Sequence, residues 1–236
     1  MTLASCDSRK TAGENPFFTE WDTPHGVPPF DKILPEHFMP AFERGMSLHE
    51  AEIDAITSNK DEATFENTIL AYDDAGQMLA QTELVFGMLC AAETNDRMQA
   101  LQEQAMPLLA AHRDKIRLDD KLFVRVKEVY DRRAALGLDA EQMRLLQKTY
   151  DSFVRAGALL DAEQKARLKE INGQLSLTAV KFGNNILAEN NNFVLELKSD
   201  ELDGLPAGIR DAAREKPQQM GKGDKWVFTL HKPSLI

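Results

Sequence analysis

The sequence predicts a mainly α protein: an antiparallel bundle of long helices with a small two-strand β element near the C-terminus. Over most of the region 36–190, apolar residues recur at steps of three and four, which is the spacing of one helix face. After residue 192 the step shortens to two, which is typical of a strand. Apolar residues make up 43% and charged residues 28% of the 236 residues, so the chain is long and apolar enough to bury a core without disulfides or metals.

Residues 1–13 are interpreted as a signal remnant or a flexible tether. Leu3-Ala4-Ser5-Cys6 resembles the lipobox of bacterial lipoproteins, in which the cysteine is lipidated, so Cys6 is a candidate lipidation site. This interpretation predicts a lipid-anchored or periplasmic protein of the cell envelope. The alternative is a cytoplasmic protein in which Cys6 lies in a frayed tail.

Residues 14–35 form a predicted extended arm that is rich in proline and aromatic residues. Proline removes a backbone donor and disfavours helix in the residue before it. The aromatic side chains are expected to anchor the arm on the rest of the molecule. They include Phe17, Phe18, Trp21 and Phe30.

The helical region 36–190 is expected to begin with a helix whose first turn holds Pro40. One face of this helix follows steps of three and four and comprises Phe42, Met46, His49, Ile53 and Ile56. The next helix is expected to run unbroken over 65–93. Thr64 is its predicted N-cap, and Gly76 falls among the residues of its recurring face.

Three further helices are expected to start at polar caps, and a fourth to begin near Asp120 and stop at Gly137. The predicted caps are Asn95, Asp139 with Gln142, and Asp161 with Gln164. The last of these helices is expected to end near Asn190. Residues 191–236 then read as a strand, a short helix from about Pro206 and a second strand over Lys225–His231, the start of a subdomain truncated at the C-terminus.

The charge balance argues against nucleic acid as a partner. The chain has 28 basic and 38 acidic residues, a net charge of −10, and binding a polyanion depends on clustered basic residues. The basic residues of one segment are interleaved with acids and are expected to lie on an exposed helix face; they are Lys121, Arg125, Lys127, Arg132 and Arg133. The apolar runs are short, so no transmembrane segment is predicted.

The residues needed for catalysis or metal binding are not recognisable in this chain. His49-Glu50 begins like the zinc motif H-E-x-x-H, but Ile53 stands where the second histidine belongs. No pair among the five histidines has ligand spacing, so His49 and His112 are expected to be partly buried, hydrogen-bonded packing residues. Cys90 is expected to be a small buried thiol. The sequence therefore predicts no catalytic and no metal-binding residue here, and it leaves any substrate-binding residues unknown.

A family resemblance is carried by many spaced motifs. The first group resembles the N-terminal region of the thimet-type (M3) metallopeptidases and comprises Pro28-Pro29-Phe30, Pro35-Glu36-His37-Phe38-Met39-Pro40-Ala41-Phe42 and Thr64-Phe65-Glu66-Asn67-Thr68. The second group resembles the bacterial peptidyl-dipeptidase, or dipeptidyl carboxypeptidase, branch and comprises Thr94-Asn95-Asp96, Asp151-Ser152-Phe153-Val154-Arg155-Ala156-Gly157, Phe182-Gly183-Asn184-Asn185 and Lys225-Trp226-Val227-Phe228-Thr229-Leu230. Together the motifs cover residues 15–236 in order.

The resemblance implies a helical enzyme with a deep channel that releases dipeptides from the C-termini of oligopeptides. In that family the zinc ligands lie far downstream, beyond Ile236, so no zinc is expected to bind this chain. The chain is then the channel-wall region, inactive by itself, and its partners are the oligopeptide substrate and the remaining C-terminal part of the polypeptide. The alternative is a stand-alone helical module that binds peptides or proteins.

Overall fold

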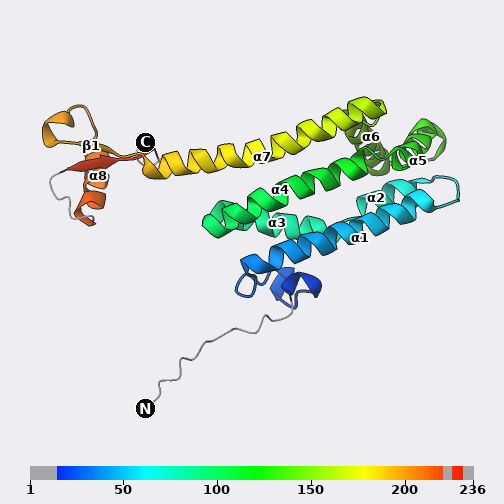
Figure 1. Ribbon diagram of the computed structural model, residues 1–236, viewed down its shortest axis with the longest axis horizontal. Coiled ribbons are helices and arrows are strands. Elements are labelled where there is room, and N and C mark those ends of the chain that lie inside the picture. Colours follow the sequence, from blue (N-terminus) through cyan, green and yellow to red (C-terminus); the bar gives the residue numbers. More distant parts are fainter. Residues whose placement is uncertain (1–14, 220–224, 231–236) are drawn as a thin grey trace, which may run out of the picture. The chain divides into compact units, whose positions relative to one another are not determined.

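The computed structural model describes residues 15–219 and 225–230, and it confirms the predicted fold class. Long helices dominate, and a two-stranded antiparallel sheet follows near the C-terminus (Figure 1). The described residues fall into two compact units, one up to Leu177 and one from Thr178. The predicted tether over 1–13, with Cys6, lies outside the described residues.

The first unit is a set of helices packed against one another (Figure 1). Its helices are α1 (Phe38–Ser58), α2 (Ala71–Asp73), α3 (Gln77–Ala92), α4 (Asp96–Arg117), α5 (Asp120–Asp131) and α6 (Ala140–Arg155). Helix α7 (Ala162–Asn192) begins in this unit and ends in the second. Helix α1 packs against both α3 and α4.

Polar caps start these helices as the sequence predicts. Asn95 Oδ1 accepts hydrogen bonds from the backbone N–H groups of Arg97 and Met98 at the start of α4. Asp139 and Gln142 form a reciprocal capping box at the start of α6, and Asp161 and Gln164 form another at the start of α7. These bonds satisfy backbone donors that have no partner inside the helix.

Two apolar cores form on the same helix. The first core takes Phe38, Ala41 and Phe42 from the N-terminal half of α1; its other buried members are Phe17, Ile33, Leu79, Val85, Phe86, Met98, Ala105 and Leu109. The second core takes Ile53 and Ile56 from the C-terminal half; its other buried members are Ala63, Phe65, Ile69, Ile116, Leu122, Phe123, Val126, Val129, Leu146, Phe153 and Ala158. Helix α1 is therefore shared by both cores.

The N-terminal arm is anchored by its aromatic residues, as expected. Phe17 is buried in the first core, with its ring centroid 5.4 Å from that of Phe38. Trp21 packs edge-on against Phe17, and its indole N–H donates to the carbonyl oxygen of Pro16 at 2.8 Å. The arm includes short 3-10 turns at Pro16–Phe18, Pro24–Gly26 and Pro35–His37.

The prediction of one unbroken helix over 65–93 is wrong. Thr64 does cap the segment, but Phe65–Leu70 is a π-helical stretch, and the α2 helix that follows ends at Asp73. The chain then turns at Gly76, whose φ of 77° lies in the left-handed region that favours glycine, before α3 begins. The Gly76 N–H donates to Glu52 Oε2 on α1 at 2.7 Å. Periodicity alone did not separate a glycine on a helix face from a glycine that ends the helix.

The second unit contains the predicted strand, helix and strand. Strand β1 (Leu195–Leu197) pairs antiparallel with β2 (Trp226–Phe228), with Glu196 opposite Val227. Helix α8 (Ala207–Gln219) lies between them in sequence and packs against β2. A small core unites these elements and includes Leu202, Ala213 and Phe228.

Helix length and hydropathy decide whether a helix could cross a membrane. Within the described ranges, 15–219 and 225–230, no helix combines enough length with enough apolar character to span a bilayer.

Replacing Gly76 with alanine is expected to destabilise the protein more than replacing Gly137 with alanine. Both glycines have a positive φ, 77° and 64°, so each substitution costs about 1–2 kcal/mol in backbone strain. A Cβ at Gly76 would also lie 2.8 Å from His49 Nδ1, whereas a Cβ at Gly137 would meet no atom within 4 Å. We expect an additional loss of about 1–3 kcal/mol for Gly76→Ala in urea denaturation. Equal losses for the two variants would contradict this packing.

Candidate functional site

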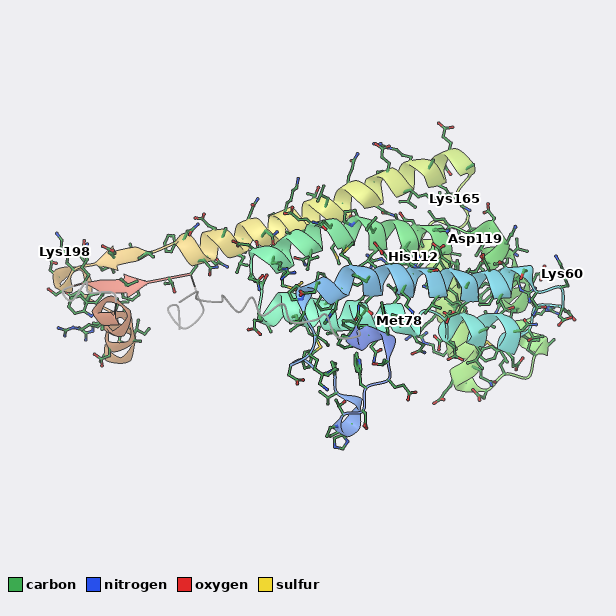
Figure 2. The ribbon with its side chains drawn as sticks, turned by 60° about the horizontal axis from the view of Figure 1, so that its bottom comes forward. Lys60, Met78, His112, Asp119, Lys165 and Lys198 are labelled. Atoms are coloured by element: carbon green, nitrogen blue, oxygen red, sulfur yellow. The ribbon has the colours of Figure 1, made fainter. Side chains whose placement is uncertain are left out.

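The candidate site is a polar cluster between the two apolar cores, where α1 lies beside α4. It comprises His49, Glu50 and Glu52 from α1, and His112 and Lys115 from α4; we call these five residues the histidine cluster. Figure 2 labels His112 in the stretch where these two helices run together. Its position follows from α1 itself, because His49 stands between the halves that enter the two cores.

The two imidazole rings contact each other directly. His49 Nδ1 and His112 Nε2 are 3.1 Å apart, a hydrogen-bond distance. The His112 side chain is 3% exposed, and its other ring nitrogen, Nδ1, lies 3.5 Å from Glu50 Oε1. Glu50 is held in turn by Lys115, whose Nζ is 2.8 Å from Glu50 Oε2. The result is a chain of polar contacts from His49 through His112 and Glu50 to Lys115.

Burial sets the protonation behaviour of this cluster. It lowers the pKa of His49, and the neighbouring His112 lowers it further. Burial likewise lowers the pKa of His112, while the Glu50 carboxylate opposes this shift. The hydrogen bond from Lys115 lowers the pKa of Glu50. Burial therefore favours the neutral form of both imidazoles, and the contact with Lys115 favours the charged form of Glu50.

The described residues do not fit a zinc ion. Across 15–219 and 225–230, no three His, Cys, Asp or Glu side chains come together in a way that could hold a metal. Ile53, which occupies the place of the second histidine in the sequence His49-Glu50-x-x, is buried in the second core. His49 and His112 provide only two imidazoles, and their facing nitrogens are occupied by each other.

A second polar cluster corrects one prediction from the sequence. Arg125 was expected on an exposed helix face, but it is only 8% exposed. Its Nη1 donates to the carbonyl oxygens of Asn59 and Asp61 at 3.0 and 3.2 Å, and its Nη2 donates to Asn67 Oδ1 at 3.1 Å. These hydrogen bonds from Arg125 hold the loop between α1 and Phe65 against α5. The loop is remote in sequence, so the local charge pattern gave no sign of this burial.

Asn67 belongs to the Thr64–Thr68 motif and has a structural role. Its side-chain oxygen accepts hydrogen bonds from the Thr64 N–H and the Thr68 hydroxyl, each at 2.8 Å, in addition to Arg125. Its amide nitrogen donates to the carbonyl oxygen of Glu62 at 2.9 Å. The motif therefore stabilises the start of the helical segment Phe65–Leu70 that follows α1.

Cys90 behaves as a packing residue. It is partly buried against the first core, and burial raises the pKa of its thiol. A raised pKa reduces the thiolate fraction and therefore the reactivity of the sulfur.

Comparison with curated proteins finds relatives that are named as peptidases. It is 37% identical over 92% of its length to dipeptidyl carboxypeptidase of Escherichia coli (strain K12). It is 23% identical over 91% of its length to oligopeptidase A of the same organism, and 22% identical over 85% to a thimet-like oligopeptidase of Dictyostelium discoideum. No family model matches the chain.

These relatives confirm the resemblance read from the motifs: over nearly its whole length the chain is similar to proteins named dipeptidyl carboxypeptidase and oligopeptidase A, and over 85% of its length to a thimet-like oligopeptidase. The chain spans about a third of the length of these relatives, 32% for the Escherichia coli dipeptidyl carboxypeptidase.

Replacing Glu50 with glutamine is expected to lower the pKa of His112 below its value in the unmodified protein. The substitution removes the negative charge that favours the imidazolium and leaves the Lys115 charge nearby. NMR titration of the ring signals measures the shift. Glu36→Gln is the matched control, because Glu36 pairs with the exposed Arg97 instead. An unchanged or raised His112 pKa in Glu50→Gln would contradict the assigned contact.

Replacing Arg125 with methionine is expected to lower the free energy of unfolding by about 2–3 kcal/mol, because two loop carbonyl groups and Asn67 lose their buried donor. Lys121→Met, on the exposed side of the same helix, is the control and is expected to stay within about 0.5 kcal/mol of the parent. Urea denaturation measures both. A loss for Arg125→Met as small as that of the control would show that the loop does not depend on Arg125.

Proposed function

We propose that the chain is the N-terminal, channel-wall region of a zinc-dependent peptidyl-dipeptidase that releases dipeptides from the C-termini of oligopeptides. The observation that supports this best is the 37% identity to a protein named dipeptidyl carboxypeptidase, against 23% to oligopeptidase A over a similar stretch. The higher identity favours the dipeptide-releasing branch of the family.

In this proposal the chain supplies scaffold and other residues supply the chemistry. The described residues do not form a metal site, and about two thirds of the relatives' length has no counterpart in this chain. We place the H-E-x-x-H motif, the zinc and the catalytic groups in that unmatched part. The isolated chain is then inactive, and oligopeptides are substrates of the complete enzyme only.

Exposed apolar side chains support the presence of a large partner. Leu175 is 61% exposed and Phe182 is 66% exposed, although both lie on the long helix α7. An amphipathic helix of this length is normally stabilised by packing its apolar residues against another element. We propose that the remaining C-terminal part of the polypeptide covers them.

The alternative function, a stand-alone helical module that binds peptides or proteins, is favoured by one surface feature. A groove of about 760 Å³ lies between the N-terminal arm and α3. Its lining includes Phe17, Trp21, Met78 and Leu84, so it offers apolar and aromatic surface to a bound chain.

For localisation, we propose the cell envelope, with Cys6 as the lipidated residue. The support is the sequence Leu3-Ala4-Ser5-Cys6 alone. A cytoplasmic protein is the alternative. Labelling cells with a radioactive or alkyne-tagged fatty acid distinguishes them, because Cys6→Ser abolishes incorporation only if Cys6 is the acceptor.

A chimera tests the proposed function. Residues 15–236 of this chain replace the matching segment of Escherichia coli dipeptidyl carboxypeptidase, and release of the C-terminal dipeptide from an N-acylated tripeptide is followed by mass spectrometry. We expect the chimera to release the dipeptide, and the isolated chain to release none with or without added zinc.

Three outcomes would count against this proposal. A folded chimera without dipeptide release would contradict the channel-wall role, and metal-dependent release by the isolated chain would contradict its inactivity. Peptide binding by the isolated chain, lost when Trp21 is replaced with alanine, would favour the stand-alone module. Circular dichroism of each protein is the control for folding.

A further inference from the structure

The contact between His49 and His112 links two helices at a point that neither apolar core covers. The rings are 3.1 Å apart at His49 Nδ1 and His112 Nε2. In such a contact one ring donates its N–H and the other accepts with a free lone pair, so at least one imidazole must be neutral. If both rings were protonated to imidazolium, neither facing nitrogen would keep a lone pair to accept the hydrogen bond. Two cations would then stand at this distance.

Both carboxylates and cations lie around the pair, so protonation is favoured by some neighbours and opposed by others. From α1 come Glu50, which already pairs with Lys115, and Glu52, which accepts from the Gly76 N–H. From α4 come the cations Lys115 and Arg113, both of which oppose protonation of His112. From α3 comes Glu83, which lies 3.8 Å from Arg113.

The His49 ring also packs against the turn that leads into α3. The His49 ring lies so close to Gly76 that a Cβ atom at position 76 would be 2.8 Å from His49 Nδ1. His112 is the more deeply enclosed of the two rings, because its side chain is 3% exposed whereas His49 is partly exposed. His49 therefore has more room to move than His112, and its movement would uncover the turn at Gly76.

We propose that His49 and His112 form a proton-sensitive latch that joins α1 and α4 and holds the turn before α3. The latch is closed while at most one of the two rings is an imidazolium cation, and it opens when both rings are imidazolium cations. This inference rests on the contacts around the two rings and does not depend on the proposed peptidase function.

The direction of the pH effect follows from the burial of both rings. Their pKa values lie below 6.5, the ordinary value, so the folded protein binds fewer protons than the unfolded chain as the solution becomes acidic. Stability is then fully present above about pH 6.5 and is lost progressively as the pH falls from there toward the lowered pKa values.

The test compares the full chain with a non-titrating version of the pair. Asparagine at position 49 keeps a polar atom in place of Nδ1, and glutamine at position 112 keeps one in place of Nε2, so H49N/H112Q can retain the contact without accepting a proton. His25→Asn is the matched control, because His25 is exposed and has a φ of 61°, which asparagine tolerates.

The readout is amide hydrogen exchange of residues 76–80 at about pH 7.5 and about pH 5.5, corrected for the intrinsic effect of pH and referenced to α6. In the parent chain and in His25→Asn, we expect the opening constant of this segment to rise about tenfold or more at the lower pH. In H49N/H112Q we expect no such rise. The same rise in the double variant would overturn the latch.

A second measurement keeps the proposal testable if the double variant does not fold. Ring NMR signals of the parent chain give the titration of both histidines directly. We expect the two rings to titrate in separate steps, the second accompanied by loss of the Gly76 amide protection. Two rings that titrate together, with that protection intact, would also overturn the latch.

Discussion

Helix α1 is the constraint on which the rest of the first unit depends, because both apolar cores are built on it. Its N-terminal half buries Phe38 and Phe42, and its C-terminal half buries Ile53 and Ile56. The polar contacts of His49 and Glu52 fall between these halves, and Glu52 also fixes the Gly76 turn through which the chain returns as α3. Since α3 packs closely along α1, with Leu79 touching Gly45, the position of that turn decides how the first core forms.

Two residues of the motifs that carry the family resemblance, Asn67 and His37, make structural contacts. Asn67 gathers three donors at the start of the segment after α1, and His37 accepts the N–H of Leu34 just before α1 begins. A chain can therefore share spaced motifs with peptidases over nearly its whole length while the described residues lack a metal site.

What the sequence predicted well depends on neighbours in the chain. Caps such as Asn95 and Asp139 and the two short strands are set by local residue patterns, and the structure contains them all. The misses are contacts between distant segments. Arg125 donates to Asn59 and Asn67, which lie 66 and 58 positions earlier in the chain, and His112 contacts His49 across 63 positions. Gly76 is intermediate, because its backbone conformation is local but is fixed by Glu52 and His49 on another helix.

Native-state hydrogen exchange along α1 tests most directly whether the two cores depend on one shared helix. We expect the backbone amides on both sides of His49, such as those of Phe42 and Ile53, to open with the same free energy, because neither core can lose this helix and remain packed. Opening free energies that differ between the two halves by more than about 1.4 kcal/mol, a tenfold difference in the opening constant, would contradict this and would mean that the cores fold as separate units.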